Sequence, residues 1–413
     1  MTSRPLHAVL LAPGEGAERV MEALAAALEG SGPAILPLDA TLPRARLSEL
    51  IEAFQPASIE TSRDFQRGPG AGQLAKAGAL QKAAGVDDDV AVVLATSGST
   101  GPPKGAELTG AALTASARAS LTRLGAAPGE RWLCCLPVHH ISGLGVLVRS
   151  LLAGSTPVVT ERADVGVLVR EAARPDTDRG CHYISLVPTQ LRRLLDGGAP
   201  LGEFRGILLG GAAVPAGMLD EAGASGARVV TTYGMTETCG GCVYDGVPLD
   251  DVHVATSSDG RIKISGPVLF ARYRLAPQLT RAAMRDGWFV TSDLGELAAG
   301  RLMVRGRADD VINSGGEKVV AGEVEHVLRS CPGVRDAVVV GTPDPDWGEL
   351  VTAMVVAADP AGPPRLEEIR EYVRDRLPRY AAPRSMVLID KLPMLPSGKP
   401  DRQQIRDIAI GKG

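Results

Sequence analysis

The chain has 413 residues, of which 45% are apolar, and a formal net charge of −4 at pH 7. This length suits two or three domains, and the negative charge argues against non-specific binding of nucleic acid. Aromatic residues make up only 3% of the chain, too few for platforms that stack single strands. The N-terminal apolar run is too short for a signal peptide, and no segment approaches bilayer length. We therefore expect a cytoplasmic protein with no transmembrane segment and no nucleic-acid partner.

Predicted helices and strands alternate along the first 255 residues. Helical patterns cover residues 19–28, 111–124 and the region around Leu191, and short β-branched or apolar runs occur at 91–95, 131–136, 156–160, 183–187, 205–211 and 227–234. Such alternation predicts an α/β fold with largely parallel strands covered by helices. After about Ala255 the pattern changes to hairpin-like β pieces, which predict a β-rich subdomain.

A different order of elements follows Arg307. The sequence predicts a helix at 322–330, strands at 336–341 and 351–357, a helix at 365–377, a strand at 385–390 and a last helix. In the second helix Leu366, Ile369 and Val373 recur at helical spacing, which indicates one buried face. We expect an N-terminal domain over 1–306, a hinge at 307–310 and an α+β C-terminal domain over 311–413.

The six cysteines are too widely spaced in a long chain to form a disulfide framework. Cys239 and Cys242 form a CxxC pair, but a zinc site needs a second pair, and Cys134 and Cys135 have the wrong spacing to supply it. The glycine pair between Cys239 and Cys242 favours a loop over the helix start of a thioredoxin-like motif. We expect plain thiols beside a functional loop and no metal or redox role.

A loop rich in glycine and hydroxyl groups follows the predicted strand at 91–95 and ends at Lys104. Its residues are Thr96, Ser97, Gly98, Ser99, Thr100 and Gly101. Their backbone N–H groups are not obstructed by bulky side chains and can surround an anion, to which Lys104 adds a positive charge. Pro103 stands where a Walker A loop needs its second glycine, so this is a different phosphate loop. A flexible linker is the alternative, but it would not need Pro-Pro-Lys-Gly after a buried strand.

Seven motifs, in order along the chain, resemble those of the acyl-adenylate-forming enzymes, which include acyl-CoA synthetases, luciferases and peptide-synthetase adenylation domains. They read TSGSTGPPKG, LPVHHISG, LLGGAAVP, TTYGMTET, GWFVTSD, GRADDVINSGGEKV and LPMLPSGKPDR. They span Thr96 to Arg402 and therefore most of the chain. The resemblance implies a large N-terminal domain of mainly parallel sheets layered with helices, and a small mobile C-terminal domain. It also implies that a carboxylate attacks the α-phosphate of Mg·ATP and that the acyl group then passes to the thiol of coenzyme A.

The resemblance also implies a role for each matching residue in the ATP site. The set is Thr96, Ser97, Gly98, Ser99, Thr100, Gly101 and Lys104 for the β- and γ-phosphates, Gly211, Ala212, Tyr233 and Gly234 around adenine, Thr236 for the α-phosphate, Glu237 for Mg²⁺, and Asp293 and Arg307 for the ribose. Taken singly, Glu237 could be a charge at a helix N-terminus, Tyr233 a core residue and Asp293 a turn residue. Their order along one family pattern favours the functional interpretation.

The matching residues of the C-terminal region imply a change of conformation between two half-reactions. Lys399 would bridge the substrate carboxylate and the α-phosphate, although it could also be a solvated loop lysine. Asp309 would be the hinge. After rotation, Ser314, Gly315 and Gly316 would line the path of the CoA pantetheine, because small residues allow close approach to the backbone.

Two features depart from the family pattern. Ser292 replaces the usual glycine between Thr291 and Asp293, and it would add strain of order 1 kcal/mol if that glycine has a positive φ. Only 95 residues precede the phosphate loop, which suggests a trimmed N-terminal subdomain.

The LPVHHISGLGVLVRS stretch contains the residues that we expect to contact the acid substrate. His140 matches the motif histidine near the substrate carboxylate. Arg149 lies off the apolar stripe of the predicted helix, so it could lie at the surface with its charged end in solvent. Within the family, however, a basic residue at this offset is similar to that of the o-succinylbenzoate–CoA ligases of menaquinone biosynthesis, where it would hold the second carboxylate. The compact chain and the YGMTETCGGCVYDGVP stretch resemble the actinobacterial short form of those enzymes.

Two alternatives remain: another acyl- or aryl-CoA synthetase, and an adenylation protein that loads a carrier-protein partner or only binds an acyl-adenylate. Retention of both Lys104 and Lys399 argues against a protein that only binds, and the absence of a fused carrier-domain motif favours free CoA. The expected partners are therefore a small carboxylic acid, ATP and CoA, and the sequence leaves a homo-oligomer open.

Overall fold

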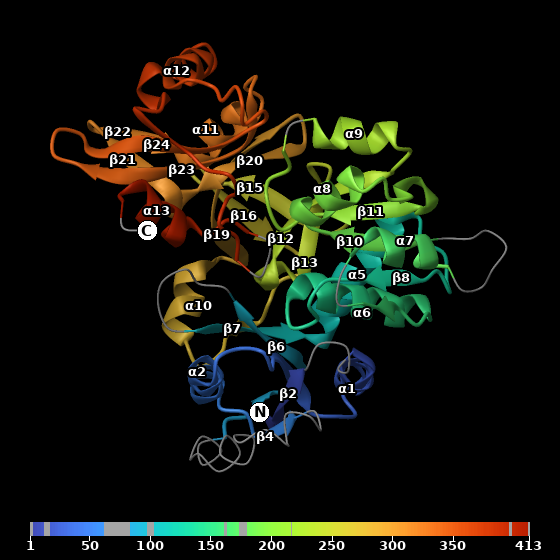
Figure 1. Ribbon diagram of the computed structural model, residues 1–413. Helices are drawn as coiled ribbons and strands as arrows, with labels where there is room; N and C mark the ends of the chain where they lie inside the picture. Colours follow the sequence, from blue (N-terminus) through green and yellow to red (C-terminus); the bar gives the residue numbers. More distant parts are fainter. Residues whose placement is uncertain are drawn as a thin grey trace.

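The computed structural model describes residues 3–11, 17–61, 83–96, 103–160, 163–172, 180–215, 217–395 and 399–411. Within these ranges the chain forms a large N-terminal part of three main sheets and a smaller C-terminal part around a fourth (Figure 1). No helix in the described ranges combines the length and apolar character needed to cross a bilayer.

The first main sheet contains the strands that flank the predicted phosphate loop. Its order is β17 (Arg272–Tyr273), β7 (Lys104–Thr109), β6 (Val90–Thr96), β3 (Ala34–Asp39), β2 (Leu6–Leu11) and β4 (Ser58–Thr61). The last four strands are parallel, whereas β7 and β17 are antiparallel to their neighbours. Helices α1 (Ala17–Glu29) and α2 (Arg44–Phe54) pack on it, and a short pair of strands, β1 (Ser3–Arg4) and β5 (Val86–Asp87), lies nearby.

The second sheet has the order β14 (Val247–Pro248), β13 (Gly240–Tyr244), β12 (Val229–Met235), β11 (Gly206–Leu209), β10 (Tyr183–Leu186), β8 (Trp132–Cys134) and β9 (Val158–Val159). The five strands from β12 to β9 are parallel, and β13 and β14 extend them in antiparallel pairing. Helices α5 (Gly110–Leu124) and α6 (Ile141–Ala153) contact both this sheet and elements of the first, whereas α7 (Val165–Glu171), α8 (Pro188–Asp196) and α9 (Met218–Ala224) pack around a second core cluster on it. The carboxyl ends of β11 and β12 therefore meet at one edge, where ligands of open α/β sheets usually bind.

The third sheet is the β-rich subdomain, and it joins the two parts of the molecule. It contains β15 (His253–Thr256), β16 (Arg261–Ser265), β18 (Met284–Arg285), β19 (Trp288–Ala298) and β20 (Arg301–Arg307), all antiparallel, and α10 (Pro277–Ala283) precedes β18. In Figure 1 it lies between the α/β sheets and the C-terminal domain.

The C-terminal domain has its own core. After a 3₁₀ turn at Ala308–Asp310, β21 (Val311–Ser314), β22 (Glu317–Val320), β23 (Val334–Asp344), β24 (Gly348–Ala357) and β25 (Ser385–Leu388) form a sheet covered by α11 (Ala321–Leu328), α12 (Leu366–Arg374) and α13 (Arg402–Ala409). In α12, Ile369 and Val373 are fully buried and Leu366 is half-buried, so the predicted face is the packed one.

The α/β architecture and the elements predicted from residue 91 onward are confirmed, including the change to antiparallel hairpins and the α+β C-terminal domain. The sequence patterns did not reveal β2, β3, β4 and α2 near the N-terminus. They also did not show that Lys104 begins a strand: β6 and β7 form an antiparallel pair in which Thr96 lies opposite Lys104. The predicted phosphate loop therefore falls between two antiparallel strands that pair with each other.

Candidate active site

Three side chains from two different sheets form a hydrogen-bonded chain. Tyr233, near the end of β12, donates its hydroxyl to Oδ2 of Asp293 at 2.9 Å, and Arg307 donates to Oδ1 at 3.2 Å. Asp293 and Arg307 are brought together because they lie opposite each other in the β19–β20 pairing. Each carboxylate oxygen of Asp293 therefore accepts one hydrogen bond, and each could also accept a hydrogen bond from a ribose hydroxyl.

The neighbouring charges shift the pKa values of Arg307 and Tyr233. Burial would lower the pKa of Arg307, but the carboxylates of Asp293, Asp309 and Asp310 outweigh it and raise that pKa. Burial and the charge of Asp293 raise the pKa of Tyr233, so the phenol keeps its proton and remains a donor. Ser292 lies within β19 and is not among the described non-glycine residues with a positive φ, so the strain expected from this substitution is absent.

Glu237 lies in a 3₁₀ turn, Thr236–Thr238, directly after β12. The buried Thr238 hydroxyl fixes this turn, because it accepts a hydrogen bond from the Met235 backbone N–H at 2.9 Å and lies 2.7 Å from the Gly240 carbonyl. Oε1 of Glu237 accepts the hydroxyl of Tyr273 at 2.8 Å, and Oε2 has no hydrogen-bond partner among the described groups. A single carboxylate with one open oxygen fits Mg²⁺ carried by ATP, which proteins usually bind through one or two carboxylates plus phosphate oxygens.

Lys399 extends from the C-terminal domain toward these groups. Burial lowers the pKa of its ammonium and the nearby Arg307 lowers it further, whereas Asp293 and Glu237 act in the opposite direction. The residue nevertheless keeps an exposed surface. One lysine of the small domain therefore lies within electrostatic reach of the proposed ribose and metal carboxylates of the large domain.

His140 is close to the same lysine. It precedes α6 in an extended conformation, and its ring lies 4.5 Å from that of His139, which is 4.0 Å from Asp39. Burial is the largest influence on His140 and, together with His139 and Lys399, lowers its pKa to about 4, against a smaller opposing effect of Asp39. The imidazole is therefore neutral near pH 7 and can donate or accept a hydrogen bond.

The other predicted ATP residues are only partly described. Ser97, Gly98, Ser99, Thr100 and Gly101 lie outside the described residues. Gly211 has φ +86°, and Ala212 is half-buried. A side chain on the preceding Gly210 would collide with Thr232 of β12, so this segment lies close to the strand that carries Tyr233. Gly234 has a packing role, because a Cβ there would lie 2.0 Å from the Gly240 carbonyl oxygen.

Arg149 points into the protein and not into solvent. Its guanidinium lies 4.4 Å from the centre of the Trp132 ring, and Nη2 donates to the Ser185 hydroxyl at 3.1 Å. A Cβ on Gly145, one turn earlier in α6, would lie 3.3 Å from Nη1, so the side chain folds back over that glycine. Burial lowers the pKa of Arg149, Nε is buried without a hydrogen-bond partner, and no salt bridge joins it to an acid within the described residues. The outer-face alternative is therefore wrong.

The predicted hinge residue Asp309 contacts this group through Arg307, whereas the residues predicted for the CoA side lie apart from it. Asp309 accepts a hydrogen bond from Arg307 at 3.0 Å and is exposed. Gly315 (φ +61°) and Gly316 (φ +85°) form the turn between β21 and β22, after the buried Ser314. Among the described contacts, none joins this turn to Lys399, Glu237 or Asp293.

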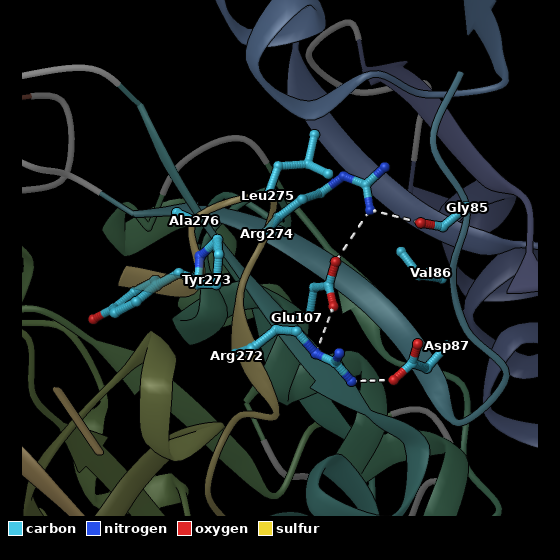
Figure 2. Close-up of a pocket in the computed structure, with 10 residues that line it drawn as sticks. Gly85, Val86, Asp87, Glu107, Arg272, Tyr273, Arg274, Leu275 and Ala276 are labelled. Carbon is cyan, nitrogen blue, oxygen red and sulfur yellow. Dashed lines mark hydrogen bonds and ion pairs between the residues drawn. The ribbon is translucent and has the colours of Figure 1, made fainter. Parts of the chain in front are cut away.

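Sequence reasoning missed a cluster of ion pairs around a cavity of about 240 Å³ (Figure 2). Glu107 of β7 pairs with Arg272 at 3.3 Å and with the buried Arg274 at 3.1 Å, and Arg272 also pairs with Asp87. The charges in this cluster are already matched, so we interpret it as a structural junction between the N-terminal segments, β7 and β17. No motif indicated it, because its members lie up to 187 positions apart in the sequence.

The CxxC cysteines are buried thiols. Burial raises the pKa of Cys242 to about 12 and that of Cys239 higher still, so both keep their protons near pH 7. All six cysteines of the chain are free. The described residues contain no group of three or more His, Cys, Asp or Glu side chains arranged to hold a metal ion.

Comparison with known proteins identifies the family of this chain. Residues 17–268 match the model of the AMP-binding enzyme family, and residues 323–399 match that of the AMP-binding enzyme C-terminal domain. The chain belongs to the AMP-binding enzyme family. The two matched regions correspond to the large and small domains.

More particular similarities follow within this family. A probable 2-succinylbenzoate–CoA ligase of Mycobacterium tuberculosis is 47% identical over 334 residues, which cover 79% of this chain and 86% of the relative. The 2-succinylbenzoate–CoA ligase of Bacillus subtilis is 34% identical over 348 residues, covering 79% and 70%.

Two solved structures share the fold. The o-succinylbenzoate CoA synthetase (MenE) of Bacillus subtilis, in complex with the acyl-adenylate intermediate OSB-AMP, has a TM-score of 0.80 and 29% identity, covering 98% of this chain and 89% of that one. ATP-bound MatB from Rhodopseudomonas palustris has a TM-score of 0.84 and 25% identity, covering 99% and 89%.

Proposed function

We propose that this chain is a 2-succinylbenzoate–CoA ligase that acts in menaquinone biosynthesis. The succinyl carboxylate attacks the α-phosphorus of ATP, which forms acyl-adenylate and releases pyrophosphate. The thiol of CoA then attacks the acyl carbon, which forms the thioester and releases AMP. The observation that carries the proposal is the half-buried Arg149, whose Nε is buried without a hydrogen-bond partner and which forms no salt bridge with an acid among the described residues.

The first half-reaction brings an anion to a polyanion, so catalysis depends on cations and donors placed where charge concentrates. Lys399 supplies the mobile positive charge between the acid and the α-phosphate, and the Thr96–Gly101 loop with Lys104 holds the outer phosphates. Glu237 would hold the Mg²⁺ of Mg·ATP, and the ion would neutralise phosphate charge. Asp293 and Arg307 bind the ribose side, and the neutral His140 and Thr236 contact the reacting carboxylate and α-phosphate.

Arg149 binds the second carboxylate, on the benzoate ring. Its guanidinium lies over Gly145, which is five residues after His140, or about 7.5 Å along the helix axis at about 1.5 Å per residue. This spacing suits a diacid whose carboxylates are separated by a succinyl chain and one bond of a ring. Arg is suited to the role because its planar guanidinium can meet a carboxylate with two donors, one of which would be the unpaired Nε.

The second half-reaction requires Lys399 to leave the site. We assign the hinge to 307–310, with Asp309 as the residue that changes its backbone angles, and the 314–316 turn to the CoA side. The region from 311 onward would then move as one body on its own core. A reaction that consumes ATP and CoA also fits the cytoplasmic location expected from the sequence.

A pyrophosphate-release assay over a panel of carboxylic acids, with and without CoA, tests this function. We expect the fastest release with 2-succinylbenzoate and thioester formation only when CoA is present. Preference for a plain fatty or benzoic acid would contradict the menaquinone assignment and favour another acyl- or aryl-CoA ligase. Transfer to a carrier protein in place of CoA would favour the other alternative.

A further inference from the structure

Tyr273 stands in the chain between Arg272 and Arg274, two arginines of the ion cluster around the cavity. It belongs to β17 and pairs with Ala106 of β7, two residues after Lys104. Because successive side chains of a strand point to opposite faces, Arg272 and Arg274 point to one side and Tyr273 to the other. Figure 2 shows the Tyr273 hydroxyl directed away from Glu107 and its two arginines.

The ion cluster fixes the backbone on both sides of Tyr273. Arg274 is 4% exposed, pairs with Glu107, and donates to the carbonyls of Phe54 at 2.5 Å and Gly85 at 3.2 Å. A buried, fully bonded arginine allows little movement of its strand.

Contacts of the Tyr273 backbone and ring also restrict its position. Its backbone N–H donates to the Thr280 hydroxyl at 2.9 Å, and its ring packs against Phe270 with 4.8 Å between ring centres. The side chain is only 8% exposed. The phenol group therefore has one well-defined position.

The single polar contact of the Tyr273 hydroxyl within the described residues is Oε1 of Glu237, at 2.8 Å. The phenol hydroxyl carries a hydrogen and a carboxylate oxygen can only accept, so Tyr273 is the donor in this contact. Hydrogen bonds to an ionised acceptor are stronger than those between neutral groups.

We propose that Tyr273 is a positioning residue for the metal-binding carboxylate: its hydroxyl holds Oε1 of Glu237 and leaves Oε2 for the magnesium ion of Mg·ATP. The β17–β7 pairing also ties this carboxylate to the strand that begins at Lys104, so the metal and phosphate contacts share one rigid support. The inference rests on the role of Glu237 in the proposed function. It adds a residue outside the motif set from which the ATP site was predicted.

The test compares Tyr273→Phe with Tyr183→Phe. Tyr183 is a matched control, because it also donates its hydroxyl to a carboxylate, Glu130 at 3.1 Å, in a buried contact that includes no residue of the proposed ATP site. Binding of Mn²⁺·ATP is followed by the EPR signal of Mn²⁺ without any acid substrate, and binding of metal-free AMP is measured separately.

We expect Tyr273→Phe to raise the dissociation constant of Mn²⁺·ATP about tenfold, the scale for losing a group that orients a metal ligand, while AMP binding stays unchanged. Tyr183→Phe should match wild type in both. Unchanged Mn²⁺·ATP binding in Tyr273→Phe, or equal weakening of AMP binding, would overturn the positioning role.

Two further variants keep the outcomes distinct. If Glu237→Gln binds Mn²⁺·ATP like wild type, the metal assignment in the proposed function fails; if it weakens binding but Tyr273→Phe does not, only the positioning role fails. Should Tyr273→Phe not fold, Phe270→Leu retains the hydroxyl but loosens the ring, and it should weaken Mn²⁺·ATP binding in the same direction by a smaller factor. No change in that variant would then count against the inference.

Discussion

At the residue scale, two side chains of the proposed site have surroundings that either suppress their charge or leave it without an opposite charge. Arg149 is a cation inside the protein without an acidic partner in the described ranges, and His140 is an imidazole kept neutral by burial. Burying a charge without an opposite charge nearby costs folding free energy. Such a group is therefore usually kept because it binds a ligand of opposite charge. These two residues therefore give the most direct residue-level tests.

Replacing Arg149 with Gln should weaken the use of 2-succinylbenzoate by about 2–3 kcal/mol in kcat/KM, the scale for leaving a charged partner without its hydrogen bonds. An analogue without the ring carboxylate should be a poor substrate for wild type and should lose little more with the variant. The comparison of both substrates in both proteins isolates the pair. Arg170→Gln, on the exposed side of α7, is the control and should change neither. Equal responses of the two substrates would contradict the assignment.

The depressed pKa of His140, about 4, predicts a pH-dependent contribution to stability. An unfolded histidine titrates near 6.5, so between about pH 6.5 and 4 the unfolded state binds the proton first, and stability falls as pH falls through this window. Wild type should therefore lose about 2–3 kcal/mol relative to His140→Gln between pH 7 and pH 4. Denaturant unfolding of both proteins at several pH values measures this difference. Parallel curves would show that His140 titrates normally.

At the element scale, the helices and strands that the sequence predicted from residue 91 onward are present because their periodicity is strong, as in α12 and the β23–β24 hairpin, whereas short elements such as α7, α9 and α10 were not predicted. It did not predict β2, β3 and α2, whose mixed patterns depend on the sheet that they complete. The motif residues of the site could be found because each lies in a short continuous stretch that resembles a family motif. Tyr273 and Arg149's packing on Trp132 could not, because those contacts are long-range and depend on the tertiary fold.

A further element-scale feature is the link between α13 and the segment after β20. Arg402, the first residue of α13, pairs with Asp310 at 3.0 Å and with the buried Glu325 of α11 at 2.6 Å. Arg402→Met should destabilise the C-terminal domain by about 3 kcal/mol, because it leaves Glu325 with reduced compensation in a buried position. Thermal unfolding measures the loss. Arg365→Met, which breaks an exposed pair with Glu368, should cost less than about 1 kcal/mol, and an equally small effect for Arg402 would contradict the role of the link.

The hinge is tested by Asp309→Pro. A hinge works by changing φ and ψ, and proline fixes φ near about −65°. The variant should still form acyl-adenylate and accumulate it, whereas transfer to CoA should fail. Asp309→Asn is the control, since it removes the charge that accepts Arg307 but leaves the backbone free. Normal overall turnover of Asp309→Pro would show that the hinge lies elsewhere.

At the scale of the whole molecule, the two domains meet around one lysine. The large domain supplies Tyr233, Asp293 and Glu237 from strand ends and turns, and the small domain brings Lys399 within electrostatic reach of the two carboxylates. This arrangement corresponds to the first half-reaction of the proposed mechanism. In the proposed mechanism Lys399 leaves this place before CoA reacts, so the small domain would move between the two half-reactions.

The central claim is that Lys399 acts only in adenylation, and separate measurement of the two half-reactions with Lys399→Ala tests it most directly. Pyrophosphate release from ATP and 2-succinylbenzoate should fall by about a hundredfold to a thousandfold, which corresponds to about 3–4 kcal/mol of lost transition-state stabilisation. Thioester formation from supplied acyl-adenylate and CoA should remain within about twofold of wild type. An equal loss in both half-reactions would contradict the account.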